Sequence, residues 1–216
     1  MTTLITAGDP QALPWALDAL ERGALVAIPT DTVYGLAARL DRPAALRRLY
    51  EAKGRPEDRA IPVLLSNADL ISDLTTGLPD GAEEFAGRFW PGPLTIVLPR
   101  GPRVPDLVTA GRDTVGLRMP NHPFALALIE AAGGALAVTS ANRSGEPSLR
   151  DPAAVAEALA GEVELVVDSG STPGGRASTV VALALSGPTV LREGPLDAAT
   201  LRAAWAAVTG DDTVLD

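Results

Sequence analysis

The sequence predicts an α/β fold in which helices flank a twisted mixed sheet. Short apolar runs, such as 24–28 and 135–138, have the length of buried strands rather than of helices. Along the chain they alternate with segments whose leucines recur at helical spacing, as Leu13, Leu17 and Leu20 do. Apolar strands that alternate with amphipathic helices are typical of a sheet covered by helices.

Breaks and apolar periodicity define the elements of the first half. Gly23 is expected to end the first helix, because glycine readily adopts the left-handed conformation that follows a helix. The run Trp90-Pro91-Gly92-Pro93 is a hard break before a strand, and we expect Trp90 to anchor the core rather than to stack on a ligand. In this half we predict helices at 10–23, 43–52, 67–74 and 80–89, and strands at 24–28, 61–65 and 94–98.

Capping and turn residues define the second half. Asp151 is expected to cap a helix that has Pro152 in its first turn. Ser186-Gly187 indicates the turn of a hairpin. The Pro- and Gly-rich stretch 100–112 reads as a surface loop, and 168–176 as a glycine-rich turn. We predict helices at 122–132, 151–159 and 197–208, and strands at 113–120, 135–138, 163–167, 178–185 and 188–192.

The composition excludes several classes of protein. The chain has 216 residues, 46% of them hydrophobic, and no internal repeat or linker, so we expect one domain over 1–208 and a frayed tail over 209–216. The absence of cysteine excludes disulfides, thiolate nucleophiles and cysteine-based zinc sites. His122, the single histidine, is expected to cap or pack. With no signal peptide and no apolar stretch of about 18 residues, we expect a cytoplasmic protein without a membrane segment.

The charge pattern favours a small anionic ligand. A net charge of −9 repels polyanions over most of the surface, so an anion must be met by a local basic cleft. Aromatic residues are 4% of the chain, too few for an RNA platform of stacked aromatics. A phosphorylated small molecule therefore fits better than extended nucleic acid.

Lys53 is the only lysine among eighteen Lys and Arg residues, and Arg55 follows it two positions later. The pair lies between a predicted helix and a predicted strand. An ammonium is a compact point charge and a guanidinium a planar fork, and together they suit a polyanion. A solvated basic turn would show the same local pattern.

Two polar loops, 29–36 and 139–148, each follow an apolar run. Ligands of α/β proteins bind at the carboxyl ends of strands, and backbone N–H groups in such loops can bind anions. The alternatives are that Thr30 and Asp31 only cap the next element, and that 139–148 is a plain loop.

The predicted strand 113–120 places Thr114, Gly116 and Arg118 on one face, because side chains alternate along a strand. An arginine on the same face as a threonine is either a ligand clamp or a solvated edge residue. The local sequence does not decide between the two.

Seven short motifs occur in one order along nearly the whole chain, at residues 29–36, 53–56, 90–95, 118–120, 140–142, 178–179 and 191–194. In content and order they resemble the YrdC-like family, whose members are threonylcarbamoyl-AMP synthases. This resemblance implies a YrdC-like α/β fold, a twisted mixed sheet with flanking helices around a basic cleft.

The resemblance also implies the site residues. Catalytic roles are implied for Lys53, Arg55, Ser140 and Asn142. ATP contacts are implied for Lys53, Arg55, Arg59, Thr114, Ser140, Asn142, Ser148 and Arg192, and threonine contacts for Thr32, Leu64, Arg118, Val138 and Ser178. The sequence departs from the family pattern at Arg59, where Lys or Asn is common, and at Leu64, where some members have His.

The activity implied by the resemblance joins L-threonine, bicarbonate and ATP into threonylcarbamoyl-adenylate and releases pyrophosphate, for the threonylcarbamoyl modification of tRNA. Mg²⁺ is expected with the ATP, held mainly by phosphates and water. No metal ligand is expected from the protein, and Asp31 is the one nearby carboxylate that could contribute. Downstream tRNA-modification proteins are the expected partners, together with weak RNA binding at the cleft.

Two other classes of protein with this fold are alternatives. A non-catalytic RNA-binding module would hold structured RNA in the cleft and would form no adenylate. A carbamoyl-transfer module of hydrogenase maturation lies within a longer chain that has Cys-rich zinc segments, and the lack of cysteine argues against it. Longer family members carry a second, C-terminal domain, which this chain is expected to lack.

Overall fold

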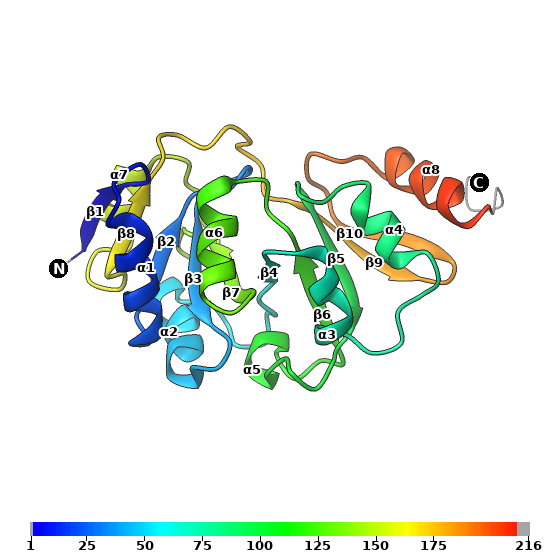
Figure 1. The fold of residues 1–216 in the computed structure, drawn as a ribbon, viewed down its shortest axis with the longest axis horizontal. Coiled ribbons are helices and arrows are strands. Elements are labelled where there is room, and N and C mark those ends of the chain that lie inside the picture. The colour runs from blue at the N-terminus through cyan, green and yellow to red at the C-terminus, as the bar shows by residue number, and fades with distance from the viewer. Residues whose placement is uncertain (1, 211–216) are drawn as a thin grey trace.

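Ten strands form one mixed sheet within residues 2–210, the part of the chain that the computed structural model describes (Figure 1). Their bounds are β1 Thr3–Thr6, β2 Val26–Ile28, β3 Gly35–Arg39, β4 Val63–Leu65, β5 Leu94–Pro99, β6 Thr114–Arg118, β7 Ala135–Ser140, β8 Leu165–Asp168, β9 Thr179–Ala184 and β10 Gly187–Arg192. Their order is β1-β8-β2-β3-β7-β4-β6-β5-β9-β10. The pairs β1–β8, β2–β8, β4–β6 and β5–β9 are parallel and the others antiparallel. The predicted α/β fold with a mixed sheet is confirmed.

Helices occupy most of the segments between the strands. Their bounds are α1 Ala12–Glu21, α2 Pro43–Lys53, the short 3₁₀ helix η1 Ala68–Leu70, α3 Ile71–Leu74, α4 Ala82–Gly87, α5 Asp106–Thr109, α6 Pro123–Ala131, α7 Pro152–Ala158 and α8 Ala198–Thr209. The Asp151 carboxylate accepts from the Ala154 N–H at 3.0 Å, so the predicted cap of α7 is confirmed. None of the helices in the described range has the length and apolarity that crossing a membrane requires.

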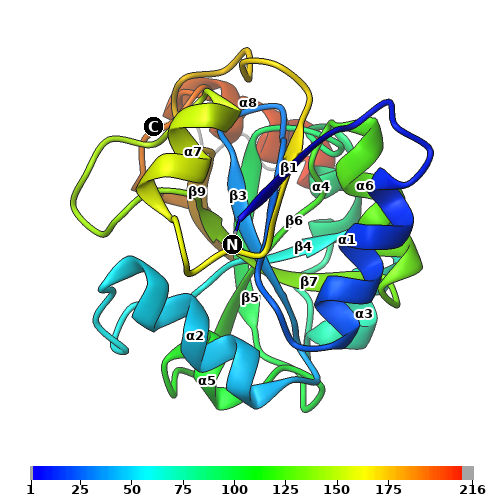
Figure 2. The same ribbon diagram turned by 90° about the vertical axis from the view of Figure 1, so that its left-hand side faces the viewer.

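The half of the sheet that contains β1, β8, β2, β3 and β7 is covered on both faces. Helices α1 and α6 pack against each other over one face, with Leu20 and Leu128 in the apolar core beneath them. Helices α2 and α7 lie over the other face, where Leu49 and Val155 are buried (Figure 2). Because both faces are covered, β2 is buried at all three positions.

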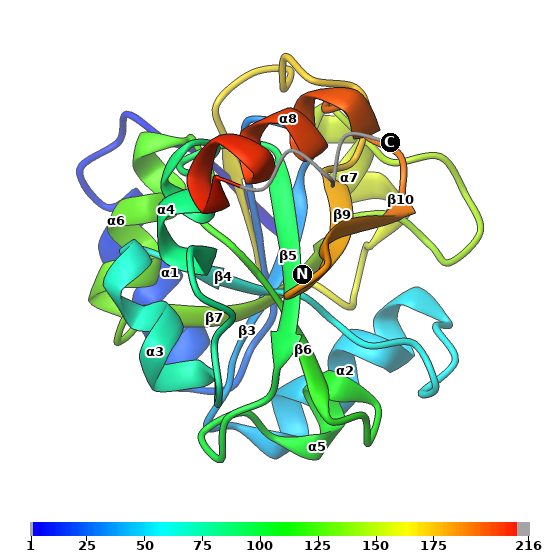
Figure 3. The ribbon, with the colours of Figure 1, turned by 90° about the vertical axis from the view of Figure 1, so that its right-hand side faces the viewer.

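The half that contains β6, β5, β9 and β10 presents its two faces to different surroundings. Helices α4 and α8 lie over this end of the sheet (Figure 3), and the rings of Phe85 and Trp205 join them edge to face with centroids 5.6 Å apart. Ile96 and Leu117 are buried in this core. The alternate residues of the same strands point to the opposite side, where they line a cavity.

Three elements differ from the sequence-based expectation. No strand was expected at β1, whose pattern hides only Ile5 because it is an edge strand. Strand β3 occupies part of what was expected to be a polar loop, since its Gly and Ala residues fit between β2 and β7 without forming a long branched apolar run. Helix α5 lies within the expected surface loop. Of the predicted tail 209–216, residues 211–216 lie outside the described part.

Two aromatic side chains were assigned structural roles. Trp90 is 6% exposed and its Nε1–H donates to the Leu94 carbonyl at 2.8 Å, so its expected role in the core is confirmed. His122 precedes α6, but its side chain makes no capping hydrogen bond, so the capping role is wrong. Its ring is half-buried and its Nδ1 is enclosed, which leaves a packing role.

The segment after β10 folds back against the start of β9. The Thr179 hydroxyl donates to the Leu196 carbonyl and accepts from the Leu196 N–H, both at 2.9 Å. This closure places Gly194 against backbone: a Cβ there would collide with the Thr179 nitrogen and would lie 2.7 Å from the Ala177 oxygen. Any side chain at this position must therefore push two backbone segments apart.

We predict that Gly194→Ala destabilises the protein by about 3 kcal/mol, because backbone atoms cannot yield as a flexible side chain can. The free energy of unfolding in urea measures the effect. Gly87→Ala is the matched control, since a Cβ there meets nothing within 4 Å, and alanine in a helix is neutral or stabilising by up to about 1 kcal/mol. Equal stability of the two variants would contradict the packing described for Gly194.

Candidate active site

A cavity of about 400 Å³ opens beside the central strands. Six strands (β4, β5, β6, β7, β9 and β10) and the segments that follow β2 and α2 contribute to its wall. Among the described residues that line it, five are arginines and none is Asp or Glu. The arginines are Arg55, Arg59, Arg112, Arg118 and Arg192. The basic cleft predicted for this acidic chain is therefore present.

The five residues expected to contact threonine all line this cavity. Strands β4, β6 and β7 supply Leu64, Arg118 and Val138, and the segments that end β2 and begin β9 supply Thr32 and Ser178. The set combines one cation, two hydroxyls and two apolar walls. It can surround a small carboxylate that carries a methyl group.

The Arg118 guanidinium is buried and held from three directions. Its Nε donates to the Gly92 carbonyl at 2.9 Å, Nη1 to the Thr32 hydroxyl at 3.0 Å, and Nη2 to an Asp31 carboxylate oxygen at 2.6 Å. These bonds use three of the five N–H groups that a guanidinium has, leaving one on each terminal nitrogen. Burial lowers the pKa of Arg118, and the Asp31 carboxylate opposes that effect.

Asp31 is a site residue that the sequence did not place. Its side chain is 14% exposed and pairs with Arg118, and its Oδ1 also accepts from the Asn121 N–H at 3.0 Å. It does not line the cavity. The expectation that Thr30 and Asp31 cap the next element is wrong, because the next element is strand β3 and not a helix.

Ser178 connects the expected threonine and ATP contacts. Its hydroxyl lies 2.8 Å from the Thr95 hydroxyl and accepts from Arg192 Nη2 at 3.1 Å, while its carbonyl accepts from the same nitrogen at 2.7 Å. Burial lowers the pKa of Arg192 first, and the charges of Arg118 and Arg55 lower it further. Three guanidinium groups thus repel one another across the cavity, and an anion between them would relieve that repulsion.

The expected ATP contacts divide into two groups. Arg55, Arg59, Thr114, Ser140 and Arg192 line the cavity, whereas Lys53, Asn142 and Ser148 do not. Arg55 is oriented by its own turn, since its Nε and Nη2 donate to the carbonyls of Arg59 and Ala60 at 3.2 and 2.8 Å. No hydrogen bond engages its Nη1, which leaves that end of the guanidinium available to an anion.

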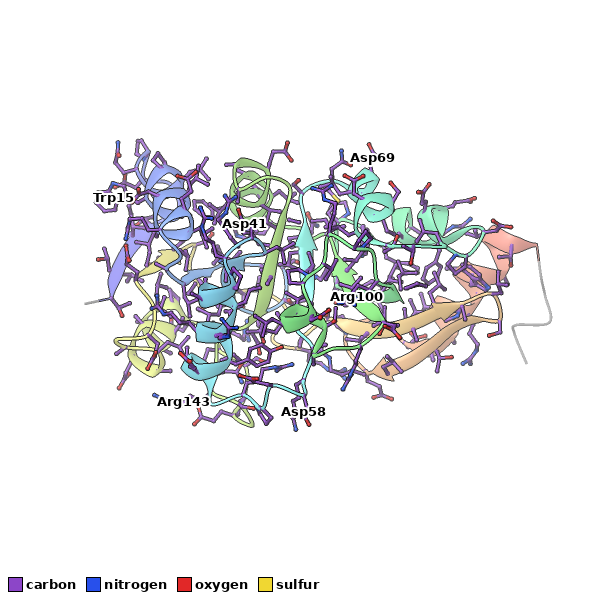
Figure 4. The ribbon with its side chains drawn as sticks, turned by 90° about the horizontal axis from the view of Figure 1, so that it is seen from below. Trp15, Asp41, Asp58, Asp69, Arg100 and Arg143 are labelled. Atoms are coloured by element: carbon purple, nitrogen blue, oxygen red, sulfur yellow. The ribbon has the colours of Figure 1, made fainter. Side chains whose placement is uncertain are left out.

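Lys53 lies behind the cavity wall. As the last residue of α2 it is 3% exposed, and its ammonium donates to the Ser140 and Asn142 carbonyls and to Asn142 Oδ1, the last at 3.3 Å. The Ser144 N–H donates back to the Lys53 carbonyl at 2.8 Å. Helix α2 and the loop after β7, in which Figure 4 labels Arg143, are therefore joined at the level of Lys53.

Asn142 uses its side chain inside the same loop. Its Nδ2 donates to the carbonyls of Arg143 and Glu146 at 2.9 and 2.7 Å, while its Oδ1 faces the Lys53 ammonium. Ser140, by contrast, binds Lys53 through its carbonyl and lines the cavity. The loop thus presents the serine to the cavity from a framework built by Lys53 and Asn142.

Sequence reasoning missed several further lining residues, among them Thr95, Val97, Arg112 and Val180. Strand alternation could have found Val97, because it shares a face of β5 with Thr95. Arg112 was expected in a surface loop, and no local signal distinguishes it from a solvated arginine.

The donor set does not fit a metal held by the protein. The cavity wall contains no carboxylate, and within residues 2–210 no three His, Cys, Asp or Glu side chains gather in a way that could hold a metal ion. Asp31, the one carboxylate considered from the sequence, is engaged by Arg118. A divalent cation would have to arrive with its own anionic ligands, as Mg²⁺ does on nucleotide phosphates.

The fold and the site together define an α/β protein whose cleft combines a carboxylate clamp with a cluster of arginines. Comparison with known proteins gives the same result. The family model Sua5/YciO/YrdC, described as "Telomere recombination", matches residues 18–194. The chain belongs to this family, and the resemblance seen in the sequence is confirmed.

Individual relatives cover the chain to different extents. The threonylcarbamoyl-AMP synthase of Pyrococcus abyssi is 45% identical over 177 residues, 82% of this chain and 52% of that protein, so the chain spans about half the length of that relative. A putative threonylcarbamoyl-AMP synthase of Mycobacterium tuberculosis is 37% identical over 200 residues, 91% of this chain and 92% of that protein. The crystal structure of P. abyssi Sua5 complexed with L-threonine matches with a TM-score of 0.87 and 39% identity, covering 97% of this chain and 61% of that one.

We predict that the Lys53 amine titrates near pH 8. Burial lowers its pKa from 10.5 to about 8, because a desolvated ammonium is less favourable than a neutral amine, and the Arg55 charge acts in the same direction. Since Lys53 is the only lysine, protein labelled with ¹³C at lysine Cε shows one lysine signal, whose shift against pH reports this group alone. A midpoint near 10.5 would contradict the buried environment described for Lys53.

Proposed function

We propose that the protein is an L-threonylcarbamoyladenylate synthase, a nucleotidyltransferase that forms threonylcarbamoyl-AMP and pyrophosphate from L-threonine, bicarbonate and ATP. The observation that carries this proposal is one cavity with a buried, oriented arginine at one end and uncompensated arginines at the other. The names of the relatives from P. abyssi and M. tuberculosis support the reaction, and the threonine complex of P. abyssi Sua5 supports the substrate.

Threonine would bind between Arg118 and the apolar wall. The two free N–H groups of Arg118 lie on its two terminal nitrogens, the pair that binds a carboxylate bidentately. Thr32 and Ser178 supply hydroxyls, and Leu64 and Val138 supply the surface that a methyl group would contact. Burial of that methyl group is worth about 1 kcal/mol and would favour threonine over serine.

The phosphates of ATP would bind among Arg55, Arg59 and Arg192, with Thr114 and Ser140 as further donors. These guanidinium groups bond to carbonyl and hydroxyl oxygens rather than to carboxylates, so their charge is not cancelled. A triphosphate would neutralise the repulsion among them. Mg²⁺ would come with the ATP, bound by phosphate oxygens and water, because the wall offers no carboxylate.

The chemistry requires positioning more than proton transfer. The threonine amine attacks the carbon of bicarbonate, water leaves, and an N-carboxylate forms. An oxygen of that carboxylate then attacks the α-phosphorus of ATP, and the bond to the β-phosphate breaks with its electron pair leaving on pyrophosphate. The second nucleophile is already an anion, so no strong base is needed in that step. A site of arginines and hydroxyls that brings two anions together and stabilises the charge on pyrophosphate suits this step.

Lys53 and Asn142 would act through the loop that they hold. Their polar groups are engaged with each other and with backbone carbonyls, so their effect on the reaction passes through the position of Ser140. In this role Lys53 is a positioning residue. The direct phosphate contacts expected of Lys53, Asn142 and Ser148 from the family resemblance remain predictions.

The product would be used elsewhere in the cell. We place the protein in the cytoplasm, where downstream tRNA-modification proteins would take threonylcarbamoyl-AMP to form threonylcarbamoyladenosine. With a net charge of −9 and its free arginines gathered inside the cavity, the protein can attract RNA at the cleft and repels it over most of its surface.

We predict that the protein releases pyrophosphate from ATP only when L-threonine and bicarbonate are both present. Omission of either removes the nucleophile, so release falls to background. A coupled pyrophosphate assay with identification of threonylcarbamoyl-AMP by mass spectrometry measures this, with serine in place of threonine as the specificity control. Pyrophosphate release that does not depend on threonine would contradict the proposed reaction.

We predict that Lys53→Arg lowers turnover about 100-fold although it keeps the charge, because displacement of reacting groups by about 1 Å has effects of that size. A guanidinium is wider and planar and does not fit among the three oxygens that surround the ammonium. Steady-state pyrophosphate release measures turnover. Arg47→Lys, an exposed exchange on the same helix, is the control. Turnover of Lys53→Arg within about threefold of wild type, as for an ordinary surface substitution, would refute the role given to Lys53.

A further inference from the structure

The five cavity arginines differ in one respect. Within the described residues, Arg118 alone among them forms a salt bridge, with the Asp31 carboxylate at 2.6 Å. Arg55 donates to carbonyls of its own turn, Arg112 to the Asp58 carbonyl at 3.0 Å, and Arg192 to Ser178. One end of the cavity therefore contains a guanidinium with its counterion, and the rest contains guanidinium groups without one.

Asp31 is held in this position by backbone. Its Oδ1 accepts from the Asn121 N–H at 3.0 Å as well as from Arg118. Gly174 lies directly over the segment, since a Cβ there would be 2.9 Å from the Asp31 carbonyl oxygen, and the Gly175 N–H donates to the Thr32 carbonyl at 3.0 Å. The carboxylate is thus a fixed part of the clamp and not a side chain that can swing into solvent.

A fixed negative charge beside Arg118 acts differently on different anions. Coulomb repulsion is proportional to the charge of the ligand, so Asp31 opposes a dianion about twice as strongly as a monoanion at the same distance. A carboxylate with one negative charge can still use the two free N–H groups of Arg118. A phosphate or sulfate dianion would have the same geometric fork but a larger electrostatic penalty.

We propose that Asp31 is a specificity-determining residue that reserves the Arg118 clamp for a singly charged carboxylate and excludes doubly charged anions of the phosphate type. Phosphate groups are what the neighbouring unpaired arginines attract, so without Asp31 the whole cavity would favour them. The identification of the carboxylate as that of threonine rests on the proposed function. If Asp31 only neutralised a buried arginine, its removal would lower stability and leave the preference among anions unchanged.

Threonine binding measured by calorimetry with and without sulfate tests the proposal. Sulfate, a dianion, replaces chloride at matched ionic strength. The proteins are wild type, Asp31→Asn, which removes the charge and keeps an oxygen for the Asn121 N–H, and Asp41→Asn. Asp41, labelled in Figure 4, is the matched control, because its carboxylate pairs with Arg39 at 2.8 and 3.0 Å outside the cavity.

In wild type and in Asp41→Asn, sulfate is expected to change the apparent Kd for threonine by less than about twofold. In Asp31→Asn, sulfate is expected to raise it by about tenfold or more, because a unit charge in contact with a guanidinium near a protein surface is worth more than a factor of ten. ATP binding serves as the check that the variant keeps its fold.

Two results would overturn the proposal: an Asp31→Asn variant that binds threonine and responds to sulfate as wild type does, or a wild-type protein from which sulfate displaces threonine. If Asp31→Asn does not fold, the wild-type comparison decides alone, since threonine binding that is independent of sulfate supports the proposal and displacement refutes it. Wild-type protein that binds no threonine at all would contradict the proposed function, and this inference with it. Threonine binding with an unchanged sulfate response in the variant would refute this inference only.

Discussion

The ammonium of Lys53, enclosed by oxygens of the loop after β7, is the interaction on which the rest of the site depends. It joins the last turn of α2 to the end of β7, two elements 87 residues apart in sequence. On one side of this junction Gly54 turns the chain in the left-handed conformation toward Arg55. On the other side the loop presents Ser140 to the cavity. A compact, strongly hydrated cation suits this place because three oxygens from one loop can replace its water.

Around this junction an acidic protein builds a positive cavity. The net charge is −9, yet the wall contains five arginines and no carboxylate among its described residues. The arginines are oriented by carbonyl and hydroxyl oxygens, which fix a guanidinium without cancelling its charge. Arg118 is the exception, because Asp31 balances it. The ligand is therefore met by charge that is already in position, the arrangement that electrostatic stabilisation of a transition state requires.

Much of this arrangement could be predicted from the sequence, and the missing parts have a common cause. Periodicity predicted most strands and helices and placed Thr114, Gly116 and Arg118 on one face of β6, and all three line the cavity. Edge strand β1 and the alanine-rich β3 were missed because neither carries a long apolar run. The partners of Lys53 and Asp31 could not be predicted, because they lie 86 or more residues away and depend on the order of strands in the sheet. A motif shows that a lysine is needed but not which way its ammonium points.

A crystal structure of the protein with L-threonine and a non-hydrolysable ATP analogue tests the central claim most directly. The account predicts that the Lys53 ammonium keeps the oxygens of Ser140 and Asn142 as its partners. It also predicts that Arg55 and Arg192 contact the phosphates and that the threonine carboxylate lies on the two free N–H groups of Arg118. A Lys53 ammonium that leaves the loop and has phosphate oxygens as its nearest partners would contradict the account.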